Sequence, residues 1–220
     1  MILFPVACVT GIVQAAQFHS LEVTHHGARY QLSADVYLAA PLPQVYQVIT
    51  DYNHLTRISS AIRQSHMLKQ IDTHTYLVFV ESRACVVFFC RNIKETQQVV
   101  ELAPQEVQAE AIPEESNVKM ASSSWHLDAE GSGTRMRWEM TLDPDFWIPP
   151  LIGPLFVKSE MRAQGEYMAQ GVEKLARERR KSLADRLMAV GKECAEIIAK
   201  APGKMMKIED LYDDKTGLPK

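Results

Sequence analysis

A change of hydrophobic period near residue 150 divides this 220-residue chain into two kinds of structure. Before it, apolar and β-branched residues gather in short segments separated by turn-forming residues, a pattern typical of consecutive strands. After it, apolar residues recur every three or four positions from Val157 to Ala176, which predicts one long helix. This order predicts an α+β domain in which the helix crosses an antiparallel sheet and closes the core.

The bounds of the individual elements follow from the same patterns. Apolar and polar residues alternate from Arg29 to Leu38, so the first strand is expected there. Pro41 and Pro43 favour a short helix that begins near them, and a second short helical segment is expected through 55–62. The further strands are expected at Thr75–Val80, Cys85–Ile93, Gln97–Leu102, Val107–Ile112, Val118–Leu127 and Thr134–Leu142.

Composition and charge exclude several classes of protein. Hydrophobic residues make up 46% of the chain, which is typical of a globular domain and not of a disordered one. The 24 Lys and Arg residues are outnumbered by 27 Asp and Glu residues, so no basic field exists to bind nucleic acid. No apolar run reaches the roughly 18 to 20 residues of a membrane-spanning helix, which excludes a channel or transporter.

The first segment resembles a secretory signal. Residues 2–16 carry no charge, and the small residues Ala15 and Ala16 offer a cleavage site before the polar stretch that begins at Gln17. The usual basic residue before the apolar run is missing, and the alternative is a buried N-terminal strand or helix. The sequence therefore predicts a signal peptide over 1–16 and export, to the periplasm, with the cytoplasm as the alternative.

The four cysteines do not form a metal-binding motif, so neither a metal nor another cofactor is expected. In an exported chain Cys85 and Cys90 are the candidates for a disulfide. Residues five apart in an uninterrupted strand point to opposite faces, so such a bridge needs a turn or bulge between them. The sequence favours two buried free thiols in an apolar strand over that disulfide.

Three motifs, in the same order, resemble those of a known superfamily. They are ADVYLAAPLPQVYQVITDYNHLTRI after the start of the first strand, SSSWHLDAEGSGTRMRWEM in the last two strands, and WIPPLIGPLFVKSEMRAQGEYMAQGVEKL in the long helix. Together they resemble the polyketide cyclase/dehydrase and START-like (SRPBCC) superfamily, which includes the coenzyme-Q-binding START proteins. The resemblance covers about 29–180 and implies a helix-grip fold, in which a curved antiparallel sheet wraps around a long C-terminal helix.

The resemblance also implies the organisation of the whole chain. A START-like domain is expected over 29–181, followed by a helical appendage over 182–200 and a flexible tail over 201–220. Residues 183–198 carry a helical apolar pattern of their own, beginning near Ser182 and Asp185, which form a candidate capping box.

A cavity for a hydrophobic ligand is what the resemblance implies for the space between sheet and helix. The apolar pattern places large, soft side chains on the side of the strands and helix that faces this space. Arg91 stands among apolar residues and is the candidate for contact with a polar ligand head, although it could equally face water. The residues expected to line the cavity are Phe79, Val87, Phe89, Arg91, Trp125, Met136, Trp138, Met140, Met161 and Met168.

No catalytic motif is found in the sequence. There is no nucleophile elbow, zinc-protease motif, phosphate-binding loop or dinucleotide fingerprint. Asp51 and Tyr52 stand where superfamily members often carry Asp-Tyr, but helix capping and packing explain them equally well. The basic residues at 177–181 favour either contact with anionic lipid or stabilisation of a helix end.

The sequence therefore predicts non-catalytic binding or transport of a lipid, polyprenyl or quinone-like molecule, with transient membrane contact and an unassigned protein partner. One alternative is a cyclase/dehydrase-type enzyme that acts on a polyketide-like substrate. Another is an interaction module that uses the 183–198 helix.

Overall fold

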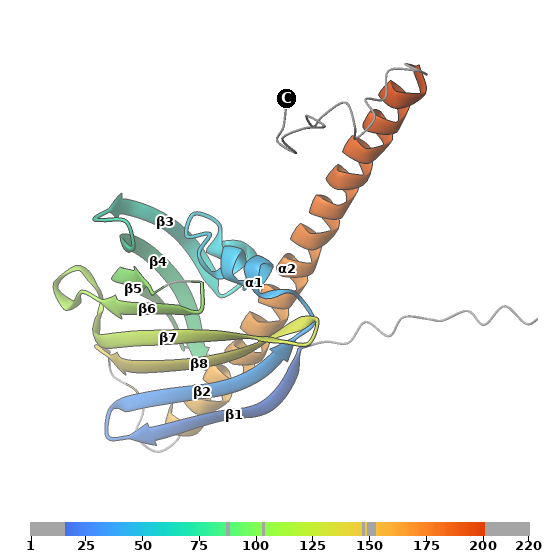
Figure 1. Ribbon diagram of the computed structural model, residues 1–220. Helices are drawn as coiled ribbons and strands as arrows, with labels where there is room; N and C mark the ends of the chain where they lie inside the picture. Colours follow the sequence, from blue (N-terminus) through green and yellow to red (C-terminus); the bar gives the residue numbers. More distant parts are fainter. Residues whose placement is uncertain (1–15, 87–88, 103, 147, 149–152, 201–220) are drawn as a thin grey trace, which may run out of the picture. The chain divides into compact units, whose positions relative to one another are not determined.

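An eight-stranded antiparallel sheet forms the main part of the computed structural model, and Figure 1 shows it curving around the first part of a long C-terminal helix. The structure describes residues 16–86, 89–102, 104–146, 148 and 153–200. The strands are β1 (Gln17–His26), β2 (Arg29–Leu38), β3 (Ile62–Gln70), β4 (Thr75–Val86), β5 (Phe89–Glu101), β6 (Glu106–Ala111), β7 (Val118–Glu130) and β8 (Gly133–Pro144). The helices are α1 (Leu42–Ile49), the single turns η1 (Leu55–Arg57) and η2 (Pro113–Glu115), and α2 (Gly153–Lys200).

The strand order is β1-β2-β8-β7-β6-β5-β4-β3. Every strand therefore pairs with its neighbour in sequence except at the contact of β2 with β8, where the chain leaves the sheet through α1 and η1 and returns at the opposite edge. The concave face of the sheet carries the residues that alternate toward α2. The order confirms the expected α+β helix-grip fold.

The concave face and the helix enclose the core of the first unit, Met1–Glu178. Two glycines of α2 permit close approach. A Cβ at Gly165 would lie 3.1 Å from Leu32 of β2, and a Cβ at Gly171 would lie 1.9 Å from the carbonyl oxygen of Ile58. The helix backbone is thus held between the β2 side of the sheet and the segment after η1.

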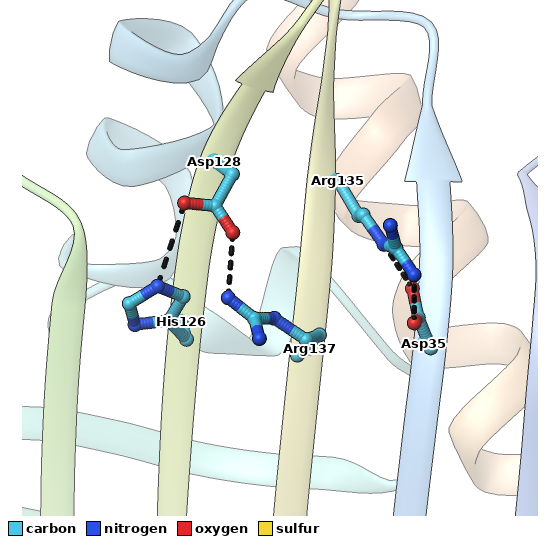
Figure 2. Close-up of polar contacts among 5 residues, drawn as sticks. All are labelled: Asp35, His126, Asp128, Arg135 and Arg137. Atoms are coloured by element: carbon cyan, nitrogen blue, oxygen red, sulfur yellow. Dashed lines mark hydrogen bonds and ion pairs between the residues drawn. The ribbon is translucent and has the colours of Figure 1, made fainter.

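The convex face carries ion pairs between neighbouring strands. Figure 2 shows Arg135 donating to both carboxylate oxygens of Asp35 at 2.9 and 2.6 Å. It also shows Asp128 between Arg137 at 2.7 Å and His126 at 3.4 Å. The bond from Arg135 lowers the pKa of the Asp35 carboxyl.

Two strands were not expected from the sequence. In β1 a register shift between Phe18 and Ser20 breaks the alternation of apolar residues. In β3 most side chains are exposed because it is an edge strand, so the apolar period is weak. The second short helical segment was predicted too long, since only η1 is helical and Ile62 already begins β3.

The segments predicted as Cys85–Ile93 and Gln97–Leu102 are also corrected. Cys85 belongs to β4, and the chain from Phe89 to Glu101 is one strand, β5. The helix α2 continues through Ser182 and Asp185, so these residues do not cap a separate helix.

The chain clusters into two units, and the second is Arg179–Lys220. In its described part it is helical, and the side chains of residues 180–196 are exposed. None of the described helices is long and apolar enough to cross a membrane. The predicted signal segment, except Ala16, and the predicted tail lie outside the described residues, so both remain predictions.

Candidate ligand-binding site

Aromatic and methionine side chains meet on the concave face beside α2. Trp125 of β7 and Trp138 of β8 are paired across the two strands, and their rings stack with centroids 4.7 Å apart and an angle of 13° between planes. Met140 and Met168 pack against the same cluster, and Met161 of α2 is buried in it. The structure therefore brings these predicted site residues together on an apolar surface made by both sheet and helix.

Small side chains occupy the middle of this face. Ala109 of β6, Ser123 of β7 and Met140 of β8 are cross-strand neighbours in one row. All three keep accessible surface, although the row is bounded by the buried residues Val99 and Leu32. Ala109 and Ser123 have small side chains, and both also contribute to a hollow on the opposite, convex face. We take the concave side of this row as the candidate position of a ligand.

Trp138 contributes a polar atom that lacks a partner. Its side chain is only 4% exposed, and its indole Nε1–H donates to no acceptor within the described part of the chain. A buried N–H group without an acceptor costs free energy, so such groups usually find a partner in protein, water or ligand. Trp138 is thus a buried donor on the concave face whose hydrogen bond is not made.

Glu95 and Gln97 place further polar groups on the concave side of β5. They pair with Val80 and Val78 of β4, two residues of the core, so both side chains lie on the core side of the sheet. Gln97 Nε2 donates to Glu95 Oε2 at 2.9 Å. Burial raises the pKa of the Glu95 carboxyl to about 6, although the hydrogen bond from Gln97 opposes the shift.

A third polar group lies at the end of the face near α1. Glu101 accepts hydrogen bonds from the hydroxyls of Tyr46 and of Tyr52, the latter at 2.7 Å. Burial, with these bonds and the nearby carboxylate charge, raises the pKa of both phenols. Both tyrosines therefore stay protonated donors, and Tyr52 of the Asp51-Tyr52 pair has a structural role in joining the end of α1 to β5.

Polar residues of the helix side are already satisfied. Ser59 donates to Gln164 Oε1 at 3.3 Å, and Gln164 Nε2 donates to Glu160 at 2.8 Å. Glu173, a buried carboxylate of α2, accepts from the backbone N–H of Ala39 at 3.2 Å. These bonds fix the helix on the sheet. Glu95 and Gln97, by contrast, keep hydrogen-bonding groups that the described residues do not use.

Several predicted site residues lie elsewhere. Phe79 alternates with the buried Val78 and Val80 and contacts the exposed His66, with ring centroids 5.1 Å apart, so it belongs to the convex face. Its inclusion in the site does not fit this position. Met136 is fully buried in the core and has no accessible surface to offer a ligand.

The remaining predicted residues lie at the β4–β5 hairpin. Arg91 is exposed and opposite Ala84, on the same side of β5 as Ile93. Val87 and the side chain of Phe89 lie outside the described residues.

The same hairpin corrects the cysteine prediction, because Cys85 and Cys90 form a disulfide. The chain reverses direction between Val86 and Phe89, so the two cysteines are directly opposite each other on paired strands instead of five apart in one strand. Neither Gly nor Pro occurs between the two cysteines to indicate a turn. Cys194 is free and exposed.

The convex face also has a hollow, of about 530 Å³, lined by residues from β5 to β8, both polar, such as Gln98 and Glu139, and apolar, such as Val100 and Ile112, and Ala109 and Ser123 contribute to it as well. It opens to solvent on the polar side of the sheet, and none of the predicted ligand-binding residues lines it. Because the hollow is open and lies on the solvated side of the sheet, we place the candidate site for an apolar ligand on the concave face, where the large apolar side chains gather. Among the described residues no cluster of side chains could hold a metal ion.

The basic residues at 177–181 are partly accounted for. Arg177 pairs with Glu173 at 3.3 Å, which favours the helix-stabilising interpretation for this residue. Leu183, Leu187 and Val190 are exposed in the second unit, so the interaction hypothesis for 183–198 stays a prediction.

Comparison with known proteins identifies the family. Residues 29–180 match the family described as "Polyketide cyclase / dehydrase and lipid transport". The chain belongs to this family. No match was found among curated proteins.

Solved structures share the fold of this chain. The STAR-related lipid transfer protein from Xanthomonas axonopodis is 16% identical with a TM-score of 0.54, covering 72% of this chain and 99% of its own. The Zhui aromatase/cyclase from a Streptomyces species is 13% identical with a TM-score of 0.56, covering 69% and 95%. Human STARD10 is 9% identical with a TM-score of 0.54, covering 75% and 78%. At these identities the likeness shows the START-like fold, whose members bind lipids or act as polyketide cyclases.

Proposed function

We propose that this protein binds a lipid, polyprenyl or quinone-like molecule between the concave face of the sheet and α2, without transforming it. The observation that carries the proposal is the row Ala109, Ser123 and Met140, whose partly buried side chains lie on the core side of the sheet between the buried residues Val99 and Leu32. Burial of ligand hydrocarbon there would drive binding at about 25 cal/mol per Å² before the costs of association.

The test is native mass spectrometry of the full chain purified from its own host, followed by organic extraction of whatever is released. A bound mass of lipid or quinone size supports the proposal. Ala109→Leu fills the row and should abolish the bound mass, whereas Phe79→Leu on the convex face should leave it unchanged. An apo mass that persists after incubation with total host lipid would contradict the proposal.

A cyclase-type activity is the second candidate, and Glu95 favours it. A carboxyl group with a pKa of about 6 can exchange protons near neutral pH, which suits a general acid or base. Glu95→Gln should abolish formation of a product from a polyketide-like substrate if the protein is an enzyme. Retention of bound but unaltered ligand by the wild-type protein would favour the carrier function.

We also propose that the protein works in an oxidising compartment after export. The Cys85–Cys90 disulfide supports this, because structural disulfides persist mainly outside reducing compartments. The intact mass of the protein from its host tests both points, since loss of residues 1–16 and of two thiol hydrogens changes it. A full-length mass with four free thiols would contradict the proposal.

A further inference from the structure

Glu95 and Gln97 form a polar pair inside an otherwise apolar strip. Along β5 they lie between Ile93 and Val99, which are both buried in hydrophobic clusters. The hydrogen bond between them uses one carboxyl oxygen of Glu95 and one amide hydrogen of Gln97. The other carboxyl oxygen, Oε1, has no hydrogen bond within the described residues, and the Glu95 side chain keeps accessible surface.

Within the described part of the chain, no positive charge balances the Glu95 carboxyl group. Glu95 makes no ion pair among the residues that the structure describes, in contrast to Asp35 and Glu173, each paired with an arginine. The nearest basic residue along the same side of β5 is Arg91, which is exposed and four positions away. A carboxyl group that is shielded from water and lacks a cation tolerates hydrogen-bonding groups but repels a second negative charge.

We infer that Glu95 and Gln97 bind the polar end of the ligand, and that this ligand is an amphiphile whose head has hydrogen-bonding groups but no negative charge. The inference rests on the proposed function, since it requires a ligand on the concave face. Glu95 Oε1 is available to a hydroxyl or amine of the head, and Gln97 offers its remaining N–H and its carbonyl oxygen. Fatty acids and anionic phospholipids are disfavoured.

The test is calorimetric titration of the delipidated full chain at pH 7.5 with dodecanol, dodecylamine and dodecanoate, which share one chain length. We expect dodecanol to bind at least about tenfold more tightly than dodecanoate, a difference that corresponds to one unfavourable charge contact. Glu95→Gln keeps the shape of the side chain and removes the charge, so the ratio should fall toward one. Glu139→Gln, on the exposed convex face, is the matched control and should keep the wild-type ratio.

A second variant keeps the inference testable if Glu95→Gln does not fold. Gln97→Leu removes the amide partner, and the affinity for dodecanol should then fall about fivefold, the effect of one hydrogen bond. Dodecylamine distinguishes a preference for a cationic head from one for a neutral head.

Equal affinities of the wild-type protein for dodecanol and dodecanoate, or a ratio that Glu95→Gln leaves unchanged, would overturn the inference while leaving the proposed function intact. Absence of binding by all three compounds would overturn both.

Discussion

The two halves of the concave face differ in how they meet the helix. On the β1–β2–β8 side, Leu21, Leu32 and Trp138 pack against the backbone of α2 at Gly165 and are almost completely buried. On the β5–β6–β7 side, Ala109 and Ser123 keep accessible surface. In both halves, successive side chains along a strand alternate between the concave and the convex face. The difference shows that the alternation of side chains along the strands does not by itself decide how closely each half is packed; the size of the side chains contributes as well.

The largest expected effect is a cavity on the packed side. Leu32 is 2% exposed, and its Cδ1 lies close to Gly165. Leu32→Ala should lower the free energy of unfolding by about 2–5 kcal/mol because the surrounding atoms cannot fill the space. Urea denaturation measures the free energy of unfolding. A loss below about 1 kcal/mol would show that Leu32 is not closely packed against the helix.

A pair of small-to-large substitutions compares the two halves directly. Ala34→Leu on β2 should destabilise the protein by about 1–3 kcal/mol, since Ala34 is fully enclosed opposite Trp138. Ala109→Leu should change stability by less than about 1 kcal/mol, because its row has room. Equal destabilisation in thermal unfolding would remove the distinction between the halves.

A pH titration examines the polar part of the open half. The pKa of Glu95 is raised by burial from 4.5 to about 6, so the folded protein binds its proton more tightly than the unfolded chain. This contribution to stability is complete below pH 4.5 and is lost as the pH rises through about 6, a change of about 1–2 kcal/mol. The stability of Glu95→Gln relative to wild type should therefore increase between these pH values. An identical pH dependence of the two proteins would contradict the burial of Glu95.

The smallest effect is expected on the convex face. Asp35→Asn removes a solvent-exposed ion pair with Arg135, and such pairs contribute little because water and salt screen them. The midpoint of unfolding should shift only slightly, and less at high salt. A loss as large as that of Leu32→Ala would mean that the convex face is not simply a solvated surface.

Much of the domain could be predicted from residue patterns alone. The strand Arg29–Leu38 and the helix that follows Pro41 were predicted at their observed positions, and Trp125, Trp138 and Met140 were predicted on the face where they lie. The register of β1 and the exposed edge strand β3 were missed, since a bulge and a lack of burial each weaken the apolar period.

The polar members of the site were missed for a related reason. Glu95 fell in a polar gap between two predicted strands, although its spacing from Ile93 and Val99 places it on the core side of one continuous strand. Glu101 lies at the end of that strand and is recognisable only through the two tyrosines that donate to it. A local pattern cannot reveal partners that are about fifty residues away in the chain.

The sequence by itself determined the order of the elements in this START-like domain, because hydrophobic period and turn residues act locally. Tertiary structure alone decided that Cys85 and Cys90 meet, that Phe79 faces outward, and that Ala109 and Ser123 stay partly buried while Leu32 and Trp138 are enclosed against Gly165 of the helix. These outcomes depend on strand register and on which residues the sheet and α2 bring into contact. Both are fixed by packing among residues far apart in the chain.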